Sequence, residues 1–98
     1  MPAEPIPSLA PDLAVEILSE GNTKAEMERK LQEYFAAGTQ LVWYFDPRSR
    51  TVTVYTAPDQ FTILNESQTL DGGELLPGLV ISLHELFERA SRRRGLAT

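Results

Sequence analysis

The chain has 98 residues, which is enough for one domain with a hydrophobic core and too few for two. Its 42% apolar residues exclude a disordered chain, and the absence of cysteine excludes a disulfide framework, a thiolate metal site and a cysteine nucleophile. The single histidine, His84, cannot form a histidine-rich zinc site and is interpreted as a surface or packing residue. Neither a membrane-length apolar run nor a signal peptide is recognisable, so we expect a cytoplasmic protein without a membrane partner.

Charge is spread unevenly along the sequence. Residues 1–88 hold 5 basic and 14 acidic side chains, whereas the net charge of the whole chain is −5 because four arginines follow: Arg89, Arg92, Arg93 and Arg94. This acidity excludes a bulk electrostatic clamp on DNA, although an enzyme could still act on DNA through a local metal site. The arginines could form a phosphate-binding tail, but a solvated helix end is favoured, since cations stabilise a helix C-terminus.

The first half of the chain predicts a strand followed by a helix. Residues 1–11 contain four prolines and are expected to form an extended lead-in. Residues 12–19 are almost wholly apolar, which is typical of a strand buried on both faces. Thr23 and Glu26 have the spacing of a capping box, and the helix that they open is predicted to end near Ala37, before a glycine.

The second half predicts three strands, a connector and a second helix. The strands are expected at 41–45, 51–55 and 61–64, with a brief one at 80–81 after a turn-rich connector over 70–78. The last helix is expected from 82 to about 94, followed by a tail over 95–98. The resulting order β-α-β-β-β-α predicts one α/β domain over 12–94, with a mixed sheet in which the first two strands are parallel.

Two charged residues interrupt apolar patterns. Glu16 lies within the first strand, and Lys30 shares the helix row of Met27 and Tyr34. Both lie about 10 Å from the turn that joins the strand to the helix, so we expect them to be level with each other. They could form a purely structural ion pair. They could also form a metal site, with Glu16 binding a divalent cation such as Mg²⁺ and Lys30 orienting a water or stabilising an oxyanion.

Several segments together resemble a known family. They are Pro11–Ser19, Lys30-Leu31 with Tyr34 and Gly38, Val42-Trp43, Asp46-Pro47 and Leu76-Pro77-Gly78. This pattern, which runs from about Pro11 to Phe87, resembles the Uma2 (DUF820) family of the PD-(D/E)XK nuclease superfamily. The resemblance implies a restriction-endonuclease-like fold and Mg²⁺-dependent hydrolysis of nucleic-acid phosphodiesters. It also implies that Glu16 is the metal-binding acidic residue, and that Lys30 provides the lysine, because Leu18 stands at the usual lysine position.

The resemblance also implies that this sequence lacks elements that family members carry. Family members carry a glutamate-bearing helix and a Pro-Asp strand before the segment seen here, so we expect only a half-core, truncated on its N-terminal side. Asp12 lies about 13 Å from Glu16 along an extended strand and cannot share a Mg²⁺ ion with it. Asp46 is interpreted as a turn-starting residue.

Two functions remain open at this point. One is a metal-dependent endonuclease-like domain acting on DNA. The other is a catalytically inactive relative that serves as a binding module, or as a homo-oligomer that covers the exposed sheet.

Overall fold

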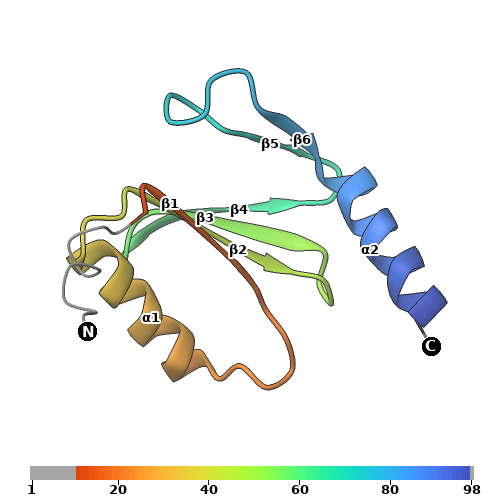
Figure 1. Cartoon of the computed structure of the whole chain (residues 1–98), viewed down its shortest axis with the longest axis horizontal. Coiled ribbons are helices and arrows are strands. Elements are labelled where there is room, and N and C mark those ends of the chain that lie inside the picture. The colour runs from red at the N-terminus through yellow and green to blue at the C-terminus, as the bar shows by residue number, and fades with distance from the viewer. Residues whose placement is uncertain (1–10, 98) are drawn as a thin grey trace, which may run out of the picture.

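A computed structural model describes residues 11–97, with side chains to residue 92, as a four-stranded sheet, a two-stranded hairpin and two helices (Figure 1). The elements are β1 Leu13–Ile17, α1 Lys24–Ala36, β2 Leu41–Asp46, β3 Thr51–Ala57, β4 Gln60–Asn65, β5 Thr69–Asp71, β6 Val80–Ser82 and α2 Leu83–Ala97. The predicted lead-in falls almost wholly outside the described residues. The second helix continues to Ala97, beyond the end predicted near residue 94.

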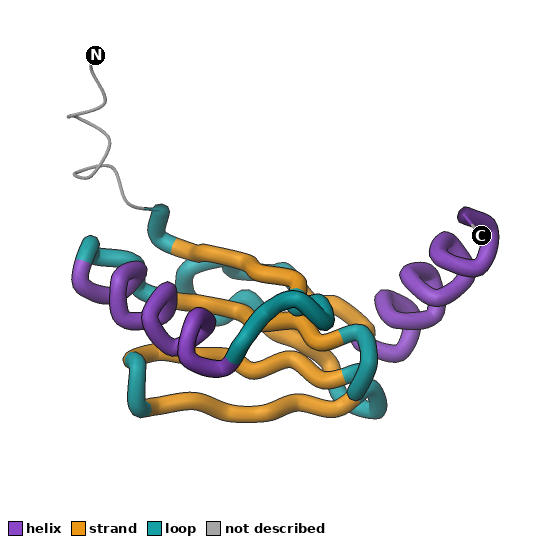
Figure 2. Tube along the Cα trace, turned by 90° about the horizontal axis from the view of Figure 1, so that it is seen from below, coloured by secondary structure: helices purple, strands orange, loops and turns teal. Residues whose placement is uncertain are grey.

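The main sheet is mixed and has the order β1-β2-β3-β4. β1 and β2 are parallel and are connected through α1, whereas β2, β3 and β4 form an antiparallel meander. Figure 2 shows α1 lying across the sheet, while the second helix extends away from it. The predicted α/β class and mixed sheet are confirmed. No helix in the described residues is both long and apolar enough to cross a membrane.

The capping box positions α1. The Thr23 hydroxyl accepts a hydrogen bond from the Glu26 N–H at 3.1 Å, and the Glu26 carboxylate accepts one from the Thr23 N–H at 3.4 Å. At the other end Gly38 has φ +109°, a left-handed value that favours glycine after a helix. Both predicted ends of the helix are therefore confirmed to within a residue or two.

The side chains of β2 alternate between two hydrophobic clusters, one on each face of the sheet. Tyr44 packs under α1, in a cluster with Ala14, Met27, Leu31 and Val42. Trp43 and Phe45 point to the other face, where they pack with Val52, Leu70, Leu83 and Phe87 beneath the hairpin and the start of α2. The consecutive aromatic residues of β2 are thus core residues, because successive side chains of a strand point to opposite faces of the sheet.

Two expectations about the strands are wrong. The first strand is not buried on both faces, because Val15 and Ile17 are 50% and 70% exposed on the face away from α1. The hairpin and α2 cover the centre of that face but do not reach these side chains. The connector over 70–78 also contains part of a strand, since Leu70 pairs with Ile81. A three-residue strand beside the Gly72-Gly73 turn is too short to give a sequence signal.

Candidate functional site

Glu16 and Lys30 meet where α1 crosses β1. Strand alternation turns Glu16 toward the helix, and the second turn of the helix brings Lys30 level with it. The Lys30 Nζ atom lies 3.1 Å from Glu16 Oε2, and the two side chains are 38% and 22% exposed, respectively. The predicted proximity of these residues is confirmed. The ion pair is partly open to solvent, so a ligand can approach it.

Tyr34 is a third member of the site. The sequence placed it in the helix row of Met27 and Lys30 and among the segments that resemble the family, but predicted no role for it in the site. Its phenol donates a hydrogen bond to Glu16 Oε2, the oxygen that Lys30 also approaches. Residues four apart on a helix are neighbours, so the spacing of Lys30 and Tyr34 was the available signal.

The protonation states of this cluster follow from its contacts. The Tyr34 hydrogen bond, with a smaller contribution from Lys30, lowers the pKa of Glu16 and outweighs the opposing effect of burial. The same hydrogen bond raises the pKa of Tyr34 to about 12. At neutral pH the site therefore holds a carboxylate, with a protonated phenol as donor.

Tyr44 forms the buried floor beside this cluster. It lies opposite Glu16 in the register of β1 and β2, and its hydroxyl donates to the main-chain oxygen of Met27 at 2.8 Å. Burial first, and the charge of Glu16 second, raise the pKa of Tyr44 to about 12. Its hydrogen bond joins α1 to the sheet under the Glu16–Lys30 pair.

The described residues supply only part of a binding site for a divalent metal ion. A carboxylate is the oxygen ligand that Mg²⁺ prefers, and Glu16 offers one. However, residues 11–92 contain no group of three or more potential ligand side chains. Asp46 accepts a hydrogen bond from the Arg48 N–H at 3.0 Å, which agrees with its interpretation as a turn residue. His84 lies on the surface, 3.3 Å from Glu66. A complete metal site would need donors from outside these residues.

Comparison with known proteins identifies a matching family and a similar crystal structure. The model of the Uma2 family, described as "Putative restriction endonuclease", matches residues 3–84. A crystal structure of a putative nuclease belonging to DUF820 from Anabaena variabilis ATCC 29413 matches with a TM-score of 0.71 and 26% sequence identity. The match covers 81% of this chain and 45% of that chain, so this chain spans less than half of that structure. No curated protein matches the sequence. The similarity confirms the predicted nuclease-type fold over the matched part.

Proposed function

The chain belongs to the Uma2 family of putative restriction endonucleases, and from that premise we propose that it carries part of a phosphodiester-hydrolysing site built on Glu16 and Lys30. The observation that carries the proposal is the convergence of the Lys30 ammonium and the Tyr34 phenol on one oxygen of Glu16. This cluster is partly exposed and charged at neutral pH, and its side chains come from a strand and a helix.

Each side chain has a distinct task in the proposed reaction. Glu16 would donate one carboxylate oxygen to Mg²⁺, which supplies Lewis-acid polarisation of a phosphate when it is bound. Lys30 would orient the attacking water or stabilise the negative charge that develops on the phosphate oxygens. Tyr34 is a positioning residue, because its hydrogen bond fixes the orientation of the Glu16 carboxylate and keeps it ionised.

The substrate that fits this proposal is nucleic acid, with DNA as the first candidate. The acidity of the chain disfavours a broad phosphate-binding surface. Recognition would therefore depend on the local cation and on Lys30. Affinity for DNA in the absence of a divalent cation is expected to be weak for the same reason.

A second candidate function is a catalytically inactive relative that acts as a binding or homo-oligomerising module. It is favoured by the single carboxylate of the cluster and by the exposed apolar side chains of Val15 and Ile17. Within residues 11–92 the donor set is incomplete, and hydrolysis needs further ligands. The two candidates make opposite predictions for nuclease activity.

Plasmid nicking distinguishes the two candidates. If the chain hydrolyses DNA, it should nick supercoiled plasmid with Mg²⁺ or Mn²⁺ and not with EDTA, and Glu16→Gln should abolish nicking. Glu20→Gln is the matched control, because it removes an exposed carboxylate from the turn after β1 and should leave nicking unchanged. Equal, metal-independent background in all three proteins would reject hydrolysis and support the inactive module.

A further inference from the structure

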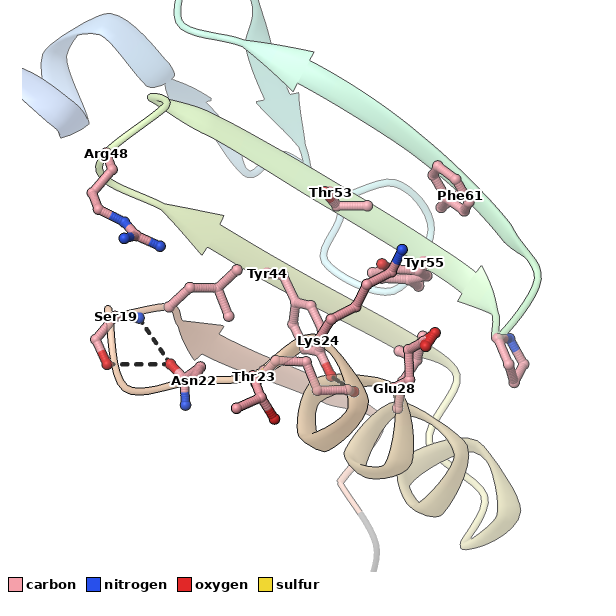
Figure 3. A pocket seen from close by; sticks show the side chains of 14 residues that line it. Ser19, Asn22, Thr23, Lys24, Glu28, Tyr44, Arg48, Thr53, Tyr55 and Phe61 are labelled. Carbon is pink, nitrogen blue, oxygen red and sulfur yellow. Dashed lines mark hydrogen bonds between the residues drawn. The ribbon is translucent and has the colours of Figure 1, made fainter.

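A cleft lies between α1 and the part of the sheet that this helix does not cover (Figure 3). The buried sheet residues beneath α1 belong to β1 and β2, and the cleft extends from there over β3 and β4. Its volume of about 480 Å³ falls within the usual range for small-molecule sites, about 300–1,000 Å³. We propose that this cleft binds a nucleoside phosphate, with the base on Tyr55 and Phe61 and the phosphate at Arg48.

Two aromatic rings give the cleft a surface on which a base can stack. Tyr55 on β3 and Phe61 on β4 are partners in the strand register, and their ring centroids are 5.4 Å apart. Tyr44 packs edge-on against Tyr55 at 5.3 Å, and its own phenol is held by the hydrogen bond to Met27. Phe61 is nevertheless 55% exposed. Every nucleobase has an apolar face that stacks on such rings, so a base would cover this surface.

The charge of the cleft is opposite to that of the chain around it. Residues 1–88 hold 5 basic and 14 acidic side chains. Two of these basic residues, Lys24 and Arg48, line the cleft, together with one acidic residue, Glu28. The lining therefore carries one net positive charge within an acidic chain, which favours an anionic ligand.

The two ends of the cleft differ, and this difference orients the ligand. Arg48 lies at one end, whereas Tyr55 and Phe61 lie at the other (Figure 3). Burial first, and the charge of Glu28 second, raise the pKa of Tyr55, so Glu28 acts on the aromatic end. Lys24 stands one turn before Glu28 on α1 and offsets its charge there. The phosphate is therefore favoured beside Arg48, and the Glu28 carboxylate can accept a hydrogen bond from an amino group of the base.

The Arg48 end offers hydrogen-bond donors for a phosphate. The Arg48 side chain is 57% exposed, and its Nε atom lies 3.9 Å from Asp46, a long contact that leaves the terminal nitrogens for a ligand. The Asn22 side-chain oxygen accepts two hydrogen bonds from Ser19, at 2.8 and 3.2 Å, so its amide nitrogen is left as a donor. Thr53 lines the cleft between the two ends, where its hydroxyl can bind the sugar (Figure 3).

The cleft is separate from the proposed hydrolytic cluster. Helix positions 24 and 28 line the cleft, whereas Lys30 and Tyr34 contact Glu16. The buried side chains of Met27 and Leu31 lie between these two sides of α1. Binding of a nucleotide in the cleft is therefore independent of the proposed function, and the two can be tested separately.

Titration of the isotope-labelled chain with dAMP, followed by NMR, tests the inference, and adenine supplies the amino group that Glu28 can bind. The ring signals of Tyr55 and Phe61 and the Nε signal of Arg48 are expected to shift together. Deoxyadenosine should shift only the ring signals, and inorganic phosphate only that of Arg48. No shift at millimolar dAMP, or shifts that spare the two rings, would overturn the inference.

Substitutions at the two ends should weaken binding in different ways. Phe61→Ala is expected to weaken dAMP binding about fivefold or more, because it removes a stacking ring. Ile63→Ala is the matched control, since Ile63 is 58% exposed on the same strand and lies outside the cleft lining. Arg48→Ala should weaken dAMP binding roughly tenfold and leave deoxyadenosine binding unchanged, because only the phosphate contact is lost. Arg29→Ala, an exposed position of α1, should change neither. Equal dAMP affinity in wild type, Phe61→Ala and Arg48→Ala would overturn the site.

A short oligodeoxyadenylate distinguishes a free nucleotide from a nucleotide of an unpaired strand. Binding about tenfold or more tighter than that of dAMP, and sensitive to Phe61→Ala, would assign the cleft to a strand, because neighbouring nucleotides add contacts. Equal or weaker binding would assign it to a free nucleotide. Glu16→Gln should bind dAMP like the wild type. A chain that binds dAMP and does not nick DNA would refute only the proposed hydrolysis, whereas one that nicks DNA without binding dAMP would refute only this inference.

Discussion

The Tyr34 phenol donates a hydrogen bond to Glu16 Oε2, the same oxygen that lies 3.1 Å from the Lys30 ammonium. A carboxylate oxygen that accepts from a phenol and faces an ammonium is held in one orientation and stays ionised. The contact also joins the last turns of α1 to β1, eighteen residues away in sequence. The contact therefore stabilises the packing of α1 on β1 and also keeps Glu16 ionised. Measurements of stability at different pH values separate these two effects.

Tyr34→Phe is expected to lower the free energy of unfolding by about 1 kcal/mol at pH 7, the usual value for one partly exposed hydrogen bond. The pKa of Glu16 is lowered from its ordinary 4.5 when the chain folds. Its contribution to stability is therefore complete above pH 4.5 and is lost as the pH falls through the lower, folded value. Urea unfolding at pH 7 and pH 3 should show the difference between wild type and variant shrinking in acid. A difference that is constant with pH would show that the Glu16 charge is not involved.

Alkaline titration provides a second measurement of the same contact. The chain has three tyrosines, and all three have raised pKa values, with Tyr34 and Tyr44 at about 12. Absorbance at 295 nm should therefore show two of the three tyrosines ionising at about pH 12 while the protein is folded. Glu16→Gln should lower the pKa of Tyr34 toward 10, because it removes the charge that opposes phenolate formation. Two or more tyrosines that ionise near pH 10 in the folded wild type would contradict the geometry.

Lys30→Met is expected to reduce metal-dependent nicking by roughly a hundredfold, the usual effect of losing one group that stabilises transition-state charge. Lys24→Met, in the first turn of the same helix, is the control and should keep wild-type activity. Glu16 keeps its Tyr34 hydrogen bond in the Lys30 variant, so Mn²⁺ binding should fall less than activity. Equal loss of activity in both lysine variants would indicate a general charge effect on DNA binding.

The elements that the sequence predicted best are those with a local physical signal. The capping box at Thr23 and the alternation of Thr51–Tyr55 depend on neighbours a few residues apart, and both elements are present. The exposure of Val15 and Ile17 could not be predicted in this way. It depends on how far the hairpin and α2 reach across the sheet, which is a property of packing between distant segments.

The same distinction applies to the candidate site. Distances along a strand and a helix sufficed to place Lys30 level with Glu16, because both elements have a fixed rise per residue. The role of Tyr34 was missed, because its position in an apolar row fits a packing residue equally well. The phenol contacts Glu16 because of the direction that the Tyr34 side chain takes. That direction depends on the backbone and on the rotamers of neighbouring side chains, which the sequence pattern does not reveal.

Arg50→Ala is expected to lower the melting temperature, because Arg50 connects the β2–β3 turn with two other segments. Its guanidinium lies 2.9 Å from Glu66 and 2.8 Å from Glu88 of α2, and it also donates to Ser91 at 2.7 Å. Arg50 lowers the pKa of both glutamates, so the effect should be largest above pH 4.5 and should become smaller in acid, where only the hydrogen bond to Ser91 remains. Arg48→Ala, which removes only a 3.9 Å contact with Asp46, should leave the thermal transition nearly unchanged.

Gly72→Ala is expected to destabilise the fold by about 1–3 kcal/mol, the usual cost of inserting a methyl group into packed structure. A Cβ atom on Gly72 would lie 2.5 Å from Leu76 O and 2.7 Å from Leu76 Cβ. The loop cannot simply move away, because the Gly72 N–H donates to Leu79 O at 2.8 Å and the Leu76 N–H donates to Gly72 O at 3.1 Å. Gly21→Ala is the control, since nothing lies within 4 Å of its added methyl group. Equal unfolding midpoints in urea for the two variants would show that the loop after β5 is less tightly packed than these contacts require.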